Sequence, residues 1–397
     1  MLVDRLFTII LLNYNQEKYI YEALDSILKQ DYKNLELIIA DDSSVIFEKN
    51  KISKYLKTQN DKLTFFFMEN RVNQGTVKTV NNAIKKAHGE YILIFAADDK
   101  LYDDKVISNF SDFFKKNKDY NILTAQCCMF DKDMKKNNYD FVNIDKALSF
   151  NKQDSSNQFK MLSKSCLFAA GATAYRKCVF EKYGTPKEEY KLIEDLTYWL
   201  YLTKSGEKMK YVDFFALKHR DGGVSSNTTL KGKVPRTIQL YYLDILKMYE
   251  LEIFPSIKKF KNHEKQLLYS NYLDAAVVLS SYDKTIIKDK KKYVFKLYLK
   301  DISYFLFKMW CFLKRRVKTI LRMIKRHIKL IYKKKNVLIM LLVWLILNYF
   351  ILNTINLKFN SFALMFFNYF IARLLTWSIK LLYSYRWCRA WQQGNLR

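Results

Sequence analysis

Near its start the chain reads TIILLNYN at residues 8–15, and a second run, LIIADDSS, follows at residues 37–44. Both are short apolar runs rich in β-branched residues, which is typical of buried parallel strands. Residues 20–30 between them have helical spacing. The three segments therefore predict a β-α-β unit, and such units bind ligands beyond the carboxyl ends of their strands.

Polar residues follow both strands at that edge. The ring of Tyr14 suits stacking on a base, and the carboxylates of Asp41 and Asp42 suit the donors of a base or a ribose. This pattern favours a nucleoside site. The alternative is structural, with an aspartate that caps a helix and a tyrosine that lies on the surface.

A third strand brings carboxylates to the same edge of the sheet. After a turn at residues 73–75, residues 76–87 have helical spacing, and the apolar run YILIF at residues 91–95 predicts another buried strand. Asp98 and Asp99 follow this strand after two alanines.

The elements expected beyond residue 100 are a helix over 101–118, polar loops over 130–160, an extended stretch over 171–176 and a strand over 209–217. Glu194 and Asp195 open an apolar helix that stops at Gly206. His219 lies in a predicted loop.

The formal net charge of +29 is placed very unevenly along the chain. Residues 1–230 carry 35 basic and 31 acidic side chains, whereas residues 231–397 carry 33 and 8. A basic tail suits nucleic acid or an anionic membrane surface. Because this tail is also very apolar, we expect an anionic membrane surface and no nucleic acid as its partner.

The C-terminal part divides into four segments. Residues 231–300 predict amphipathic helices interrupted at Pro255, and residues 301–335 interleave basic with apolar side chains. The second pattern predicts a helix on the membrane surface, with a solvated basic helix packed on the enzyme as the alternative. Residues 336–385 hold two apolar segments, which predict either a helical hairpin or two membrane-surface helices. Residues 386–397 form a basic tail expected on the cytoplasmic side.

The cysteines and the N-terminus bear on the compartment. The six cysteines have no spacing typical of a zinc site or a disulfide framework, so we expect free thiols in a reducing compartment. The first residues do not resemble a secretory signal. We therefore expect the first 230 residues to stay in the cytoplasm.

With these strand-end motifs in order, residues 5–225 resemble the family 2 glycosyltransferases of the GT-A fold. The resemblance implies a Rossmann-like, mostly parallel sheet flanked by helices over residues 1–230, followed by the helical, membrane-associated C-terminal region. It also implies a nucleotide-sugar donor, usually a uridine diphosphate sugar. Tyr14, Asp41 and Asp42 would hold its base.

The same resemblance assigns the remaining roles. Asn73, Gly75 and Asp98 would complete the donor site. Asp98, Asp99 and His219 would hold Mn²⁺ or Mg²⁺, a hard cation that takes oxygen ligands and neutralises the departing diphosphate. Ala96 departs from the pattern, because many relatives carry the first Asp of a D-x-D motif there.

Asp195 would be the catalytic base for an inverting transfer, with Glu194 orienting the acceptor. The sequence therefore predicts a membrane-attached glycosyltransferase on the cytoplasmic face of the inner membrane. Its acceptor would be a lipid-linked saccharide or a growing polysaccharide. The alternatives are a catalytically idle scaffold in a membrane assembly and a nucleotidyltransferase.

Overall fold

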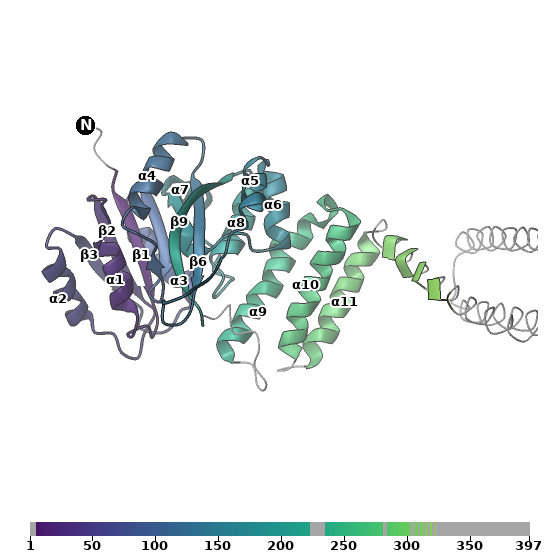
Figure 1. The fold of residues 1–397 in the computed structure, drawn as a ribbon. Coiled ribbons are helices and arrows are strands. Elements are labelled where there is room, and N and C mark those ends of the chain that lie inside the picture. Colours follow the sequence, from purple (N-terminus) through teal and green to yellow (C-terminus); the bar gives the residue numbers. More distant parts are fainter. Residues whose placement is uncertain are drawn as a thin grey trace, which may run out of the picture. The chain divides into compact units, whose positions relative to one another are not determined.

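The computed structural model describes residues 5–222, 235–280 and 284–301, with single residues and short runs from 304 to 322. Within these residues nine strands form one sheet (Figure 1). The strands are β1 (Phe7–Asn13), β2 (Leu35–Asp41), β3 (Thr64–Glu69), β4 (Tyr91–Ala96), β5 (Lys100–Leu101), β6 (Ile122–Phe130), β7 (Asn137–Asp140), β8 (Thr173–Arg176) and β9 (Met209–Arg220).

The strand order is β3-β2-β1-β4-β8-β6-β9-β5, with β7 paired to β6. β1 pairs in parallel with β2 and with β4, and β2 pairs in parallel with β3. β8 is antiparallel to both β4 and β6, and β9 is parallel to β6. β9 therefore ends at the same edge as β1, β2 and β4. The expectation of a mostly parallel sheet holds for the first half, while β5, β7 and β8 run the other way.

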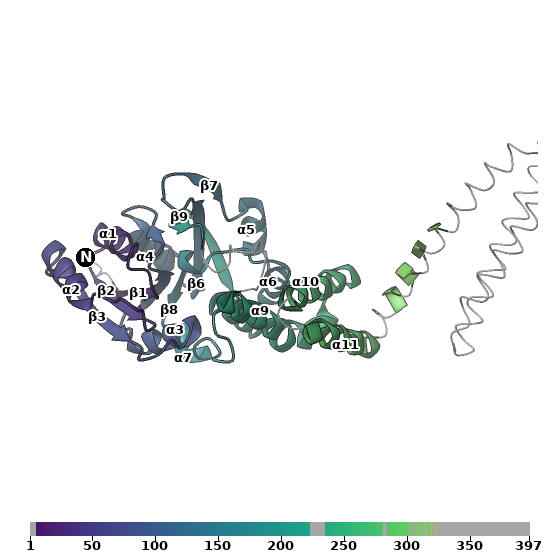
Figure 2. The ribbon, with the colours of Figure 1, turned by 90° about the horizontal axis from the view of Figure 1, so that it is seen from below.

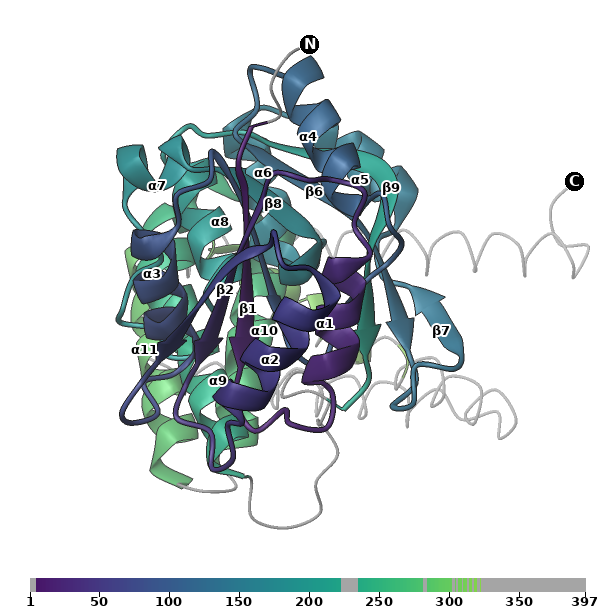
Figure 3. The same cartoon turned by 90° about the vertical axis from the view of Figure 1, so that its left-hand side faces the viewer.

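Helices cover both faces of the sheet (Figure 3). One face carries α1 (Ile20–Leu28), α2 (Lys49–Gln59) and α4 (Val106–Lys116). The other carries α3 (Thr76–Lys86), α5 (Ile144–Asn151), α6 (Ser155–Lys164), α7 (Cys178–Tyr183) and α8 (Asp195–Lys204). This mixed α/β arrangement is consistent with the expected GT-A fold.

Side chains that alternate along β1 contribute to two apolar clusters, one on each face of the sheet. Phe7, Ile9 and Leu11 pack on the α1 side, whereas Ile10 packs on the α3 side. All four are fully buried. A strand whose two faces are both covered reads as a continuous apolar run, and this is the pattern that the sequence shows.

Three helices of the C-terminal extension share the core on the α3 side. They are α9 (Arg236–Met248), α10 (Asn262–Ser280) and α11 (Lys284–Lys300), with the short π- and 3-10-helical turns η2 (Tyr249–Ile253) and η3 (Phe254–Lys259) between α9 and α10. The 3-10 turn contains Pro255, where the sequence predicts the interruption. Figure 2 shows α9, α10 and α11 side by side. Tyr249, Phe254 and Tyr272 belong to the same apolar cluster as the sheet residues.

The prediction of loops over residues 130–160 is wrong. This stretch holds β7, α5 and the start of α6. Asn143 and Asp154 cap the two helices by accepting hydrogen bonds from Lys146 N–H and Asn157 N–H. Phe150 and Phe159 bury the apolar side of each helix. The polar composition hid two short helices, because each has only a few apolar positions.

The predicted membrane segment at 336–385 and the tail at 386–397 lie outside the described residues, as does most of 301–335. Among the described residues, each helix is too short or too polar to cross a bilayer.

A buried carboxylate joins the extension to the sheet domain. Glu252, in the turn η2, is fully buried and pairs with Lys187 at 2.5 Å and with Lys204 of α8 at 2.6 Å. Burial alone would raise the pKa of Glu252, but the hydrogen bonds from both lysines outweigh it and lower the pKa below the usual 4.5. The ionised form of Glu252 therefore stabilises the fold.

We predict that Glu252→Gln lowers the free energy of unfolding at pH 7 by about 1–3 kcal/mol, since it removes two charge-assisted hydrogen bonds. Because the folded pKa is lowered, the stabilisation is present above about pH 4.5 and is lost as the pH falls through the folded value. Denaturant unfolding from pH 7 to pH 3 should show the two proteins converging in acid. Glu181→Gln, at an exposed position of α7, is the control. A constant difference at all pH values would contradict the assignment.

Candidate active site

The functional side chains gather where the parallel strands end. In the register of the sheet Asn13 lies opposite Asp41, and Leu12 lies opposite Ala96. The ends of β1, β2 and β4 are therefore level with one another. This is the edge at which parallel α/β sheets bind ligands.

Asp41 ties together the loops that follow β1 and β2. Its carboxylate accepts hydrogen bonds from the Asn13 side chain at 2.6 Å and from the backbone N–H of Ser44 at 2.9 Å. The Ser44 hydroxyl in turn accepts from Asn15 N–H at 2.8 Å. Asp41 is buried, so it acts on the site by ordering these two loops. Tyr14 stands on the first of these loops with its side chain 48% exposed, as stacking on a base requires.

Asp42 holds the start of α3. It accepts hydrogen bonds from Gln74 N–H and Gly75 N–H, both at 2.8 Å, and from the Asn70 side chain at 2.9 Å. Gly75 has a φ of +88°, a backbone conformation that favours glycine. Asp42 therefore has a structural role at the start of α3, through backbone N–H groups that lie more than thirty residues later in the chain. Asn73 is exposed in the turn just before.

Asp99 and His219 are in direct contact, and Asp98, next to Asp99 in the chain, has different surroundings. In the described part of the chain these residues do not form a group of three side chains that could hold a metal ion. Asp99 is buried, and its carboxylate accepts hydrogen bonds from Arg220 N–H at 2.9 Å and pairs with His219 Nδ1 at 2.9 Å. Asp98 is half-buried, and its carboxylate has a long contact of 3.4 Å with the Gln16 side chain. His219 stands on β9 and not in the predicted loop, because the strand runs on to Arg220.

The charges of this group are unevenly stabilised. Burial and the neighbouring charge of Asp99 raise the pKa of Asp98 to about 6. Burial would lower the pKa of His219, but the Asp99 carboxylate more than compensates and raises it. Asp98 is therefore the carboxylate at this edge that gains most from a cation.

Arg220 is a site residue that the sequence analysis missed. Its guanidinium donates to the Asp98 carbonyl at 2.8 Å, pairs with Glu22 of α1 at 3.1 Å and stacks over the Tyr19 ring at 4.1 Å. It fixes the chain at Asp98 against the first helix. The available signal was its position directly after His219 at the end of one strand, where successive side chains point to opposite faces of the sheet.

Glu194 and Asp195 lie at the start of α8, on the α3 side of the sheet. They line a small pocket with apolar side chains from four elements, namely Val80, Ile94, Tyr175 and Phe180. Burial raises the pKa of both carboxyls, and the charge of Asp195 raises the pKa of Glu194 further. Both carboxyls are therefore harder to ionise than exposed carboxyls.

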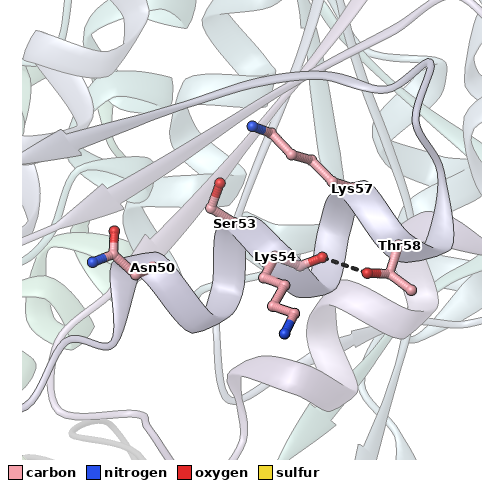
Figure 4. Close-up of a pocket in the computed structure, with 5 residues that line it drawn as sticks. All are labelled: Asn50, Ser53, Lys54, Lys57 and Thr58. Atoms are coloured by element: carbon pink, nitrogen blue, oxygen red, sulfur yellow. Dashed lines mark hydrogen bonds between the residues drawn. The ribbon is translucent and has the colours of Figure 1, made fainter.

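A hollow on the outer side of α2 is unrelated to this site (Figure 4). Its lining comes from one helix, with Ser53, Lys54 and Lys57 among the residues, and the Thr58 hydroxyl bonds the Lys54 carbonyl. It contains no residue of a strand end. The carboxyl edge of the sheet remains the candidate active site.

Comparison with known proteins gives a family match for part of the chain. Residues 8–184 match the model of glycosyl transferase family 2. An uncharacterised glycosyltransferase of Rickettsia typhi is 31% identical over 195 residues, which cover 49% of this chain and 57% of that protein. A GalNAc(5)-diNAcBac-PP-undecaprenol beta-1,3-glucosyltransferase of Campylobacter jejuni is 25% identical over 258 residues, 65% of this chain and 78% of that protein.

Two solved structures are more distant. Residues 1–349 of S. aureus TarS share 18% identity and a TM-score of 0.43, covering 71% of this chain and 82% of that one. The mannosyltransferase PcManGT of Pyrobaculum calidifontis shares 14% identity and a TM-score of 0.45, covering 70% and 73%. At these scores neither structure bears on the donor or the acceptor. Residues 8–184 thus resemble glycosyl transferase family 2, and both of these relatives are named as glycosyltransferases.

Proposed function

We propose that this protein is an inverting glycosyltransferase that moves a sugar from a nucleotide-sugar donor to a hydroxyl group of a membrane-associated acceptor. The observation that carries the proposal is the presence of two acidic sites in a domain that matches the model of glycosyl transferase family 2. Asp98, next to the Asp99–His219 pair, would face the donor diphosphate through a bound cation, while Asp195, in the lining of a mostly apolar pocket, suits the acceptor hydroxyl.

The donor half of the site suits a uridine diphosphate sugar. Tyr14 offers an exposed ring for the base, and Asp41 and Asp42 order the loops at this edge of the sheet. Both carboxylates are engaged with neighbouring N–H groups, so they support the base mainly through the loops that they order. Gly75 lies at the start of α3, and its backbone N–H group donates a hydrogen bond to Asp42.

A divalent cation fits the residues present. Asp98 supplies a carboxylate whose negative charge is poorly compensated, and His219 is oriented by Asp99 through Nδ1, which directs Nε2 to the opposite side of the ring. A carboxylate that orients a histidine in this way is common behind metal ligands. Within the described residues no group of three or more side chains suits a metal, so diphosphate and water oxygens would complete the shell. When bound, Mn²⁺ or Mg²⁺ would neutralise charge on the leaving diphosphate.

The acceptor half of the site suits base catalysis. The hydroxyl oxygen of the acceptor attacks the anomeric carbon, the bond to the diphosphate oxygen breaks, and the hydroxyl proton passes to Asp195. Burial raises the pKa of Asp195, which makes it a better proton acceptor than an exposed aspartate. Glu194 lines the same pocket as Asp195 and is placed to orient the acceptor.

We further propose attachment to the cytoplasmic face of the inner membrane. The basic and apolar composition of the C-terminal region supports it, together with the exposed side chains of Phe295 and Leu299 on the lysine-rich helix α11. The Campylobacter jejuni relative is named for an undecaprenol-linked acceptor. For this chain we propose, in the same way, a lipid-linked or polysaccharide acceptor at the bilayer.

The first prediction concerns the base. Asp195→Asn should reduce transfer roughly 10²–10⁴-fold and leave nucleotide binding intact, because the base acts in the chemical step. UDP release by detergent-purified protein, with a panel of UDP-sugars, Mn²⁺ and a membrane extract as acceptor, measures it. Glu189→Gln, at an exposed position shortly before the pair, is the control. Substantial transfer by Asp195→Asn would reject the assignment, and no release by the unmodified protein from any donor would favour a catalytically idle scaffold.

The second prediction separates the neighbouring carboxylates. Asp99→Asn should lower the free energy of unfolding by about 1–3 kcal/mol in EDTA, because it weakens the buried contacts to His219 and Arg220. Asp98→Asn, at a half-buried position with one long contact, should leave that stability nearly unchanged yet abolish Mn²⁺-dependent binding of UDP. Thermal unfolding and calorimetry check both. Equal destabilisation by the two changes would contradict the distinct roles.

The third prediction concerns attachment. Removing residues 309–397 should release the protein from membranes, because residues 1–308 form one compact unit and the removed part contains the two long apolar segments and the basic residues that flank them. Fractionation at low and high salt, with UDP binding as a test of folding, measures the effect. Continued membrane association of residues 1–308 would refute attachment through this region.

A further inference from the structure

The segment that leads to Asp195 is held from two sides. Residues 184–194 have no helix or strand, and they run between the start of α3 and the helix α9. The first residue of α8 is Asp195, and no side chain caps this helix. The placement of Asp195 therefore depends on what holds the preceding residues.

On one side the holding group is Asp244 of α9. Its Oδ2 accepts hydrogen bonds from three successive backbone N–H groups, those of residues 191–193, at 2.8, 2.6 and 3.3 Å. Asp244 is only 1% exposed. A buried carboxylate with three N–H donors is strongly fixed, and so are the donors. The nearby Lys247 adds a bond to the Glu189 carbonyl at 2.8 Å.

On the other side the segment contacts the start of α3 through Lys191. Its carbonyl accepts from Val77 N–H at 3.2 Å, and its ammonium donates to the Gln74 carbonyl at 2.8 Å. A Cβ on Gly75 would lie 2.7 Å from the same Lys191 carbonyl, so only glycine allows this approach. Gln74 and Gly75 are also the residues whose N–H groups bind Asp42 on the donor side.

We propose that Asp244 is a positioning residue for the transfer reaction, which fixes the base Asp195 relative to the donor half of the site through Lys191. The proposal rests on the proposed glycosyltransferase function. Asp244 touches neither half of the site directly. It acts on the backbone of residues 191–193, and Lys191 connects that backbone to the turn before α3. Helix α9 accordingly helps to position the base without contacting either half of the site.

We expect a substitution of Asp244 to lower the turnover rate and to leave the affinity for the donor unchanged. A misplaced base leaves the donor contacts of Tyr14 and Asp42 intact, but the acceptor hydroxyl no longer meets its proton acceptor in line. Asp244→Asn keeps the volume and one carbonyl oxygen but removes the charge that three N–H groups share.

The test uses the full chain in detergent with UDP and the best UDP-sugar as probes. Asp244→Asn should lower kcat by roughly 10- to 100-fold while the affinity for UDP changes by less than about twofold. Asp274→Asn, an exposed aspartate on the neighbouring α10, is the matched control and should behave as the unmodified protein. Lys191→Met, at an exposed position, should lower kcat in the same direction without affecting folding.

Amide hydrogen exchange provides a readout that does not need turnover. Peptides covering residues 187–195 should exchange faster in Asp244→Asn, whereas peptides of β1 and β2 should not change. Equal kcat values for Asp244→Asn and Asp274→Asn, or unchanged exchange at 187–195, would overturn the proposal. Absence of turnover in the unmodified protein would instead count against the glycosyltransferase function, and the exchange experiment would still decide whether Asp244 holds the segment.

Discussion

The parallel pairing of β1 with both β2 and β4 is the constraint on which the rest of the molecule depends. Because the three strands start and end level, the loops after them meet at one edge, and the side chains on those loops are neighbours. Antiparallel neighbours would have sent alternate loops to opposite edges. β9 extends the arrangement, since its last residues reach Asp98 and Asp99 from far along the chain.

Buried charge is the second organising feature. Asp41, Asp42, Asp99, Asp244 and Glu252 are all buried acids, and each accepts hydrogen bonds from N–H groups or lysines of distant segments. A buried carboxylate without partners would be costly, so each one fixes the segments that satisfy it. Asp98 and the Glu194–Asp195 pair differ, because burial raises their pKa values. The contrast separates acids that build the site from acids that suit its chemistry.

The sequence predicted the strand-end residues well and their partners poorly. Local apolar patterns mark the strand before Asp98 and Asp99, whereas only the family resemblance links these residues to His219, which contacts Asp99 in the structure. The helices at residues 144–164 were missed, because caps at Asn143 and Asp154 support segments with few apolar positions. Asp244 was missed for a different reason: its partners lie about fifty residues earlier, and nothing local marks an acid that will be buried. Side chains whose role depends on distant backbone carry no such signal.

The contact between Gly75 and the Lys191 carbonyl has a consequence for exchanging parts between related enzymes. The turn before α3, the segment at 191–193 and helix α9 are fitted to one another, although they come from three separate stretches of the chain. A chimaera that takes its acceptor region from a relative would need to import all three together. The natural unit of exchange in this protein is thus a spatial cluster, and a cut at the end of the family-matched segment would divide it.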